Sequence, residues 1–212
     1  MAIQQKLETP TPPNLGYPPE EYERRNFNES NGALNAYFRK VTSVLGALFG
    51  VKGSRYINAP YGAFQSTADQ TAAAINTAYA MTFNTNDYTN GITVASNSRI
   101  TVTDSGIYNL QWSGQFENTD SQDNDVRVWI KKNGTNLVGS TGFAGIPSKH
   151  GAVNGHTIIG WNYFLSLAAN DYVELWWETD STTVSIQAYA AASNYPSTAS
   201  LIATMQFVSN TL

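Results

Sequence analysis

The sequence contains no cysteine among its 212 residues. Disulfide bonds, thiolate metal sites and a thiol nucleophile are therefore excluded. Charged residues make up 13% of the chain, well below the quarter that is usual in globular proteins. The polar surface is consequently expected to consist mainly of Asn, Thr, Ser and Gln, a composition that fits β-rich proteins made to survive outside cells.

Clustered basic residues are also lacking, and the formal net charge is −4. Because phosphate binding needs grouped Lys and Arg, nucleic-acid binding is not expected. No apolar run approaches a membrane span, and the opening segment MAIQQKLETPTPPNLG has no apolar signal-peptide core. We expect a protein made in the cytoplasm that does not insert into membranes and leaves the cell as part of an assembled particle.

Proline is concentrated at the start of the chain, where residues 1–19 hold five of the eight prolines. Proline fixes φ and removes a hydrogen-bond donor, so this segment is predicted to be extended. It is either a flexible tail or an arm that docks on a partner. Its apolar residues Leu7, Leu15 and Tyr17 favour the docking arm.

Residues 20–50 show the periodicity of an amphipathic helix. The residues of its stripe are spaced alternately by four and three: Phe27, Asn31, Leu34, Phe38, Val41, Leu45 and Leu48. Gly46 and Gly50 mark the end of the helix. A helix of this kind needs a partner for its stripe, which could be its own domain, copies of itself or a scaffold protein.

Residues 51–212 are predicted to be almost entirely β, because short alternating runs are separated by frequent turn sequences. In TDSGIYNLQWSGQF, for example, Tyr108, Leu110, Trp112 and Phe116 share one face. The same alternation predicts two further rows, one of Val126, Val128 and Ile130 and one of Val173, Leu175 and Trp177. The pair Asn133-Gly134 predicts a tight type I′ hairpin. The segment TAAAINTAYAM is predicted to be strand or loop despite its alanine content. The pattern indicates a sandwich or barrel.

Four segments in this order, DSGIYNLQWSGQF, VRVWIKKNGT, FLSLAANDYVELWWE and LIATMQFV, resemble the globular heads of the complement component and tumour-necrosis-factor superfamily. The matching residues are Gly106, Ile107, Tyr108, Val128, Ile130, Lys132, Asn133, Gly134, Leu167, Asp171, Val173 and Leu175. The resemblance covers roughly residues 61–208. It implies a ten-stranded antiparallel jelly roll that forms a homotrimer.

The signal peptide and collagen-like stalk of animal members are missing. Such a head behind an arm and a helix is similar to virion structural proteins of tailed bacteriophages, in particular marine and cyanobacterial phages. The resemblance therefore implies a virion component displayed as a fibre, knob or capsid decoration, with residues 1–50 contacting another virion protein. The alternative is a carbohydrate- or receptor-binding head for host adsorption.

No enzymatic motif emerges from the sequence. The two histidines, His150 and His156, lie in one segment, and no Gly-x-Ser-x-Gly elbow is present. Glu174 and Glu178 could serve as a carboxylate pair. They alternate with tryptophan as ordinary solvent-facing residues do, so we predict a protein without catalytic activity or cofactor.

Two weaker binding hypotheses concern the loop ENTDSQDND and the outward tryptophans. Asp120, Asp123 and Asp125 could offer oxygen ligands to calcium, although a solvated hairpin loop is favoured because Asp and Asn readily fill turns. Trp129 and Trp176 are expected to face outward, either as trimer contacts or as a platform for a host surface glycan.

Overall fold

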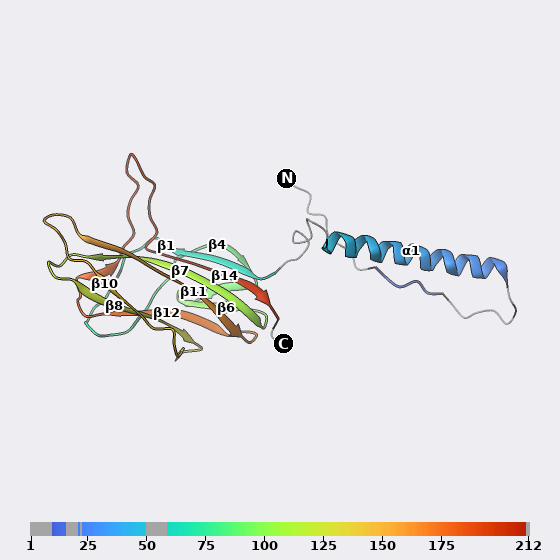
Figure 1. Cartoon of the computed structure of the whole chain (residues 1–212), viewed down its shortest axis with the longest axis horizontal. Helices are drawn as coiled ribbons and strands as arrows, with labels where there is room; N and C mark the ends of the chain where they lie inside the picture. The colour runs from blue at the N-terminus through green and yellow to red at the C-terminus, as the bar shows by residue number, and fades with distance from the viewer. Residues whose placement is uncertain (1–9, 16–20, 22, 50–58, 211–212) are drawn as a thin grey trace. The chain divides into compact units, whose positions relative to one another are not determined.

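The computed structural model describes residues 10–15, 21, 23–49 and 59–210 (Figure 1). It is mainly β, with two antiparallel sheets and one helix, as the sequence predicts. The chain divides into two compact units, Met1–Asn58 and Ala59–Leu212. Of the predicted docking arm, residues 10–15 have no regular secondary structure, and the remainder of residues 1–19 lies outside the described residues.

Helix α1 spans Arg24–Phe49 and carries the whole predicted stripe. Gly32 does not interrupt it, and Arg25 Nε forms an i,i+4 ion pair with Glu29 Oε1 at 2.9 Å. Within the described residues, no side chain of α1 is fully buried. Phe38 is 59% exposed and Leu45 is 46% exposed. The stripe therefore lies largely at the surface of the chain.

The first sheet, called sheet A here, is organised around the long strand β7. Its main strands are β1 (Tyr61–Ser66), β4 (Thr85–Asn90), β7 (Gly106–Asn118), β11 (Gly155–Leu167) and β14 (Leu201–Ser209). β11 pairs along the full length of β7. β14 and the short β13 (Val184–Ile186) pair with the other side of β7. β1, β4 and the short β2 (Gln70–Thr71) complete the sheet.

The second sheet, called sheet B, has the strand order β10-β8-β12-β6-β5. These strands are β5 (Ile92–Ala95), β6 (Arg99–Val102), β8 (Asn124–Lys132), β10 (Gly142–Ile146) and β12 (Tyr172–Thr179). Two short strands, β3 (Tyr79–Ala80) and β9 (Thr135–Asn136), pair with β12 and β8. Ten of the fourteen strands in the part of the chain that the structure describes have four residues or more.

The hydrophobic core lies between the two sheets and combines alternate residues from both. The rings of Phe116 from sheet A and Trp177 from sheet B meet edge to face, 5.9 Å apart. The buried positions include the rows predicted on three strands: Tyr108, Leu110, Trp112, Phe116, Val126, Val128, Ile130, Val173, Leu175 and Trp177. The period-2 alternation therefore identifies the core-facing side of these strands correctly.

Two turn predictions are also confirmed. Asn133 and Gly134 have φ values of 49° and 80°, the positive values that a type I′ turn requires at both central positions. The segment TAAAINTAYAM forms no helix; it runs as a loop from the end of β2 into β3. The helix propensity of its alanines is outweighed by the pairing of the strands at its two ends.

A hairpin-like excursion of residues 187–199 projects from the sandwich between β13 and β14 (Figure 1). Isolated bridges join Tyr189 to Thr198 and Ala192 to Tyr195. The excursion contains no charged residue, and Tyr195 at its tip is 53% exposed. We refer to it as the protruding hairpin.

Candidate interaction surfaces

The outer side of sheet A is formed by the residues that alternate with the core positions. Along β7 and β11, register pairs place Gln111 beside Asn162 and Asn109 beside Phe164. The strands β1, β4, β7, β11 and β14 contain no lysine or arginine, and their only acidic residues are Asp87 and Glu117. We call this side of sheet A the uncharged face.

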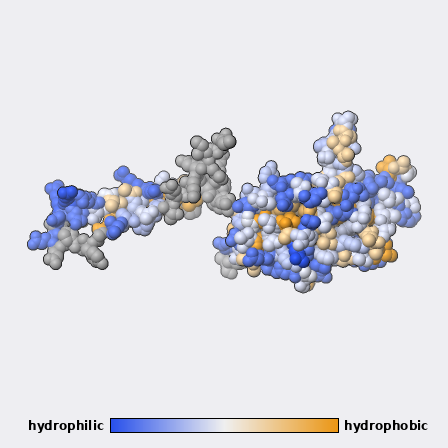
Figure 2. Space-filling view, turned by 180° about the vertical axis from the view of Figure 1, so that it is seen from behind, coloured by the Kyte–Doolittle hydropathy of each residue, from blue (hydrophilic) through white to orange (hydrophobic). Residues whose placement is uncertain are grey.

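Large apolar side chains stand on the uncharged face among amides and hydroxyls. Ile158 and Phe164 of β11, Ile202 of β14 and Tyr88 of β4 are all exposed, Phe164 by 67%. Figure 2 shows apolar groups gathered among polar ones at the surface of the sheet unit. A wide surface with exposed aliphatic and aromatic groups but little charge is typical of a protein contact.

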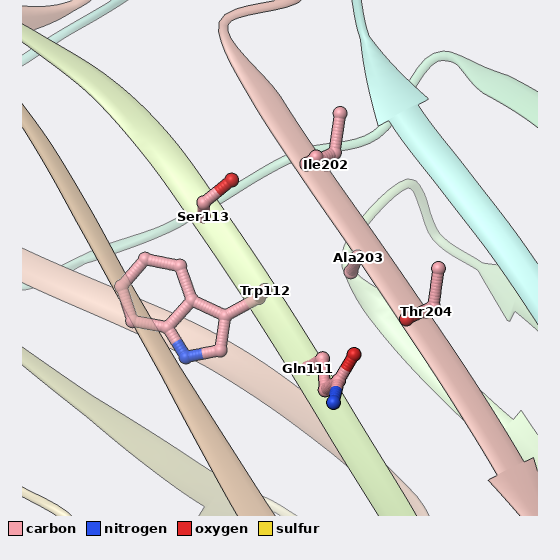
Figure 3. A pocket seen from close by; sticks show the side chains of 6 residues that line it. All are labelled: Gln111, Trp112, Ser113, Ile202, Ala203 and Thr204. Carbon is pink, nitrogen blue, oxygen red and sulfur yellow. The ribbon is translucent and has the colours of Figure 1, made fainter.

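A shallow hollow of about 340 Å³ lies between β7 and β14 on this sheet. It is lined by Gln111, Trp112, Ser113, Ile202, Ala203 and Thr204. Figure 3 shows these side chains on two neighbouring strands, with the indole of Trp112 turned away from β14. The lining contains amide, hydroxyl and aliphatic groups and no acid or base, so the hollow suits a neutral side chain.

The outer side of sheet B is built differently, as cross-strand rows on β8 and β12. The rows pair Lys131 with Glu174, Trp129 with Trp176, and Arg127 with Glu178. Arg127 Nη1 lies 3.0 Å from Glu178 Oε1. We call this side the paired face, because its charges are matched within the chain.

Trp129 and Trp176 face outward, as predicted, but both are half-buried. The ammonium nitrogen of Lys131 lies 3.4 Å from the centroid of the Trp176 ring. Trp129 Nε1 donates a hydrogen bond to Asn136 Oδ1 at 3.0 Å. Groups of the same chain therefore cover part of the surface that a sugar or a second subunit would use.

The prediction that Glu174 is an ordinary solvent-facing residue is wrong, because it is only 6% exposed. Ser98 Oγ donates a hydrogen bond to Glu174 Oε1 at 2.7 Å, and Arg99 Nε lies 3.7 Å from the same oxygen. Glu178 is engaged with Arg127. Each carboxylate thus contacts a neighbouring group of its own sheet and has a structural role in the paired face.

The three calcium candidates are not gathered around a common point, and two of them, Asp120 and Asp123, accept hydrogen bonds from backbone amides. Asp120 Oδ1 accepts from the Ser121 amide at 2.6 Å, and Asp123 Oδ1 from the Ser148 amide at 2.7 Å. The Ser148 hydrogen bonds lower the pKa of Asp123. Asp125 donates its own amide to Asp180. Across the described ranges, no three acidic, histidine or cysteine side chains group as metal ligands.

Three residues of the resemblance motifs meet where the β8–β9 turn contacts the start of β12. Asp171 accepts hydrogen bonds from Asn133 Nδ2 at 2.7 Å and from the Ala168 amide at 2.8 Å, and Lys132 Nζ lies 2.9 Å away. These contacts, led by Asn133 and then Lys132, lower the pKa of Asp171 to about 2. The motif residues therefore have a structural role in joining two turns.

A polar cluster that the sequence analysis did not identify holds the base of the protruding hairpin. The Tyr189 hydroxyl donates to Glu117 Oε2 at 2.9 Å and lies 3.0 Å from His156 Nδ1. Burial, and then the hydrogen bond to Glu117, raise the pKa of Tyr189 well above its usual value. The amide of Ala188 donates to Asp69 Oδ1 at 2.8 Å. The hairpin is thus fixed to sheet A through hydrogen bonds.

Comparison with protein-family models gives no match, and no curated protein matches the sequence. Among the described residues, no helix combines the length and apolar character that crossing a bilayer requires.

Proposed function

We propose that the chain is a non-enzymatic structural component of a tailed-phage virion, displayed as a homotrimeric fibre, knob or capsid decoration. The sheet unit would be a jelly-roll head of the tumour-necrosis-factor type, and residues 1–50 would anchor it to another virion protein. The observation that carries the proposal is the uncharged face. Its exposed apolar residues are suited to contact with copies of the same chain, whereas the exposed Phe143 on the paired face lies 5.4 Å from the Arg127 guanidinium.

Self-association through the uncharged face would cause little charge repulsion between subunits. Close to a threefold axis, identical residues of the three subunits meet, so a face nearly free of charge avoids like-charge repulsion there. Burying Ile158, Phe164, Ile202 and Tyr88 would remove their apolar surface from water, at about 25 cal/mol per Å². The neutral hollow between β7 and β14 offers space for a side chain of the neighbouring copy.

The course of the chain gives the head two distinct ends. The amide of Phe207 donates to the carbonyl of Pro60 at 2.9 Å, so the chain enters and leaves the head at one end. The amide of Ser200 donates to the carbonyl of Ser66 at the other end of the antiparallel pair β1–β14, next to the protruding hairpin. Anchoring through residues 1–50 would therefore leave the protruding hairpin at the end away from the attachment.

The proposal is tested by the mass of the purified full-length protein, measured by size-exclusion chromatography with light scattering. We expect three times the chain mass of 23.1 kDa. A single-chain mass at micromolar concentration would contradict a homotrimeric head. Immunogold labelling of particles with antibody against the sheet unit would then test the virion location separately.

The protruding hairpin supports a second candidate function, a head that binds a receptor or glycan on the host surface. It is uncharged and carries the exposed Tyr195 beside Asn194 and Ser197. An aromatic ring flanked by amide and hydroxyl groups is chemistry that suits a neutral sugar. Glycan-array binding that is lost in Tyr195→Ala, with the mass unchanged, would support this function.

A further inference from the structure

Helix α1 is more than an amphipathic helix, because its sequence follows a heptad repeat. With Asn31 placed at position a, the seven stripe residues occupy consecutive d and a positions from Phe27 to Leu48. A repeat of 3.5 residues keeps a stripe facing a second helix, whereas packing on a sheet has no such requirement. We propose that α1 forms a parallel, in-register coiled coil with the same helix of other copies of this chain. The inference rests on the proposed self-association of the head.

Four of the five charged residues of the helix fit this assignment, and the fifth, Arg24, is the first residue of the helix and falls at a before the first stripe residue. Arg25 and Arg39 fall at b, Lys40 at c and Glu29 at f, which are the outer positions of a coiled coil. The flanking e and g positions hold Asn28, Ser30, Asn35, Tyr37, Thr42 and Val44. Because these positions carry no charge, identical parallel helices meet without like-charge repulsion.

The structure supplies the second observation, since α1 is one continuous helix and, among the described residues, none of its stripe side chains is fully buried; Leu34, Val41 and Leu48 are half-buried. Phe38 and Leu45, both at a, are 59% and 46% exposed, although a coiled coil would bury them. The Arg25–Glu29 ion pair joins b and f on the outer side and leaves the stripe accessible. The helix is thus formed over its full length with an interface ready to be covered.

Parallel orientation and register follow from the head and from Asn31. Rotational symmetry of the heads about one axis would make equivalent helices parallel, and their covalent attachment to associated heads would raise their effective concentration for one another. This matters because three heptads alone are marginal. In register, Asn31 faces Asn31 of the neighbouring helix, and a single buried asparagine at a specifies alignment at some cost in stability. Residues 1–19 would then remain to contact the virion.

Single-cysteine cross-linking tests the inference on the full chain, which has no cysteine of its own. Val41→Cys places a thiol at d, where copies of the residue face each other; Ser43→Cys places it at f, on the outer side. After mild oxidation, we expect a disulfide-linked pair for Val41→Cys on a non-reducing gel and at least tenfold less for Ser43→Cys. Leu34→Cys at d and Ala36→Cys at f repeat the comparison in another heptad, in case one variant misfolds.

The mass of each variant is measured before oxidation, which separates this inference from the proposed function. An oligomeric mass with equal cross-linking at d and f would overturn the coiled coil and leave the head trimer intact. A single-chain mass with no cross-linking would overturn both. Equal cross-linking in the presence and absence of denaturant would also contradict the inference, because random collision then explains it.

Discussion

The uncharged face and the paired face are both outer sides of antiparallel sheets, but their surface side chains differ in the contacts they make within the chain. On the paired face, opposite charges sit across from each other on β8 and β12, and Lys131 covers Trp176. On the uncharged face, Phe164 and Ile158 stand among amides, and no lysine or arginine of the five main strands accompanies them. The charges of one face are therefore matched within a single chain, whereas the other face offers a group of apolar side chains that a partner would bury.

Two phenylalanines allow a direct test of this difference. Phe164 on the uncharged face is 67% exposed and Phe143 on the outer side of sheet B is 68% exposed. We expect Phe164→Asp to reduce the mass from three chains to one, because it removes an apolar contact and buries a carboxylate in every interface. Light scattering after size-exclusion chromatography provides the measurement.

Phe143→Asp is the matched control. Its ring lies 5.4 Å from the Arg127 guanidinium, so the new carboxylate would stand near a cation, and we expect the oligomer to persist. If Phe143→Asp dissociates the oligomer and Phe164→Asp leaves it intact, the assignment of the two faces is reversed.

On the paired face, the largest effect is expected from the buried Glu174. Glu174→Ala would leave the Ser98 hydroxyl and the Arg99 guanidinium without their acceptor, at a cost of about 2 kcal/mol in unfolding free energy. Glu178→Ala removes a more exposed pair with Arg127 and should cost less than about 1 kcal/mol. Urea unfolding of both variants measures the difference. Equal losses would show that burial does not distinguish the two carboxylates.

The core and the helix could be predicted from the sequence, because each depends on a local periodicity. Alternation placed Tyr108, Leu110 and Trp177 inside, and spacings of four and three placed Phe38 on the stripe. The Asn133-Gly134 turn followed from its backbone requirement for positive φ. These features need no knowledge of which strands are neighbours.

The surfaces could not be predicted, because they depend on strand order and register. Ile158 and Phe164 share the uncharged face with Ile202 only because β11 and β14 flank β7. Adjacent apolar residues, such as Ile158-Ile159 and Tyr163-Phe164-Leu165, were the available signal that both faces of β11 are apolar. Burial of Glu174 likewise depends on Ser98, which is 76 residues away in the sequence.

Acid is expected to lower the stability of sheet B by protonating Asp171. The five main strands of sheet A contain only two acidic residues. The Asn133 and Lys132 contacts lower the pKa of Asp171 from its ordinary value of 3.8 to about 2, so the charged form stabilises the fold. This stabilisation is present above about pH 4 and is lost as the pH falls towards 2. With allowance for solvent screening, we expect it to contribute about 1 kcal/mol.

Asp171→Asn should lower the unfolding free energy by that amount at pH 7, and the difference from the unsubstituted chain should shrink towards pH 2. Thermal unfolding at a series of pH values measures both. A constant difference across the pH range would mean that the loss comes from packing and not from the charge.

The smallest effect is expected where Lys131 covers Trp176. Lys131→Gln removes a cation 3.4 Å from the ring centroid and should cost about 0.5 kcal/mol, the lower end for an accessible cation–π contact. Lys149→Gln, which removes an exposed loop cation, should leave stability within about 0.3 kcal/mol and serves as the control. Because Trp176 loses its cover only in Lys131→Gln, quenching of tryptophan fluorescence by acrylamide should increase in that variant alone. An increase in both variants, or in neither, would show that Lys131 does not shield the ring, and the paired face would then offer an open tryptophan surface to a partner.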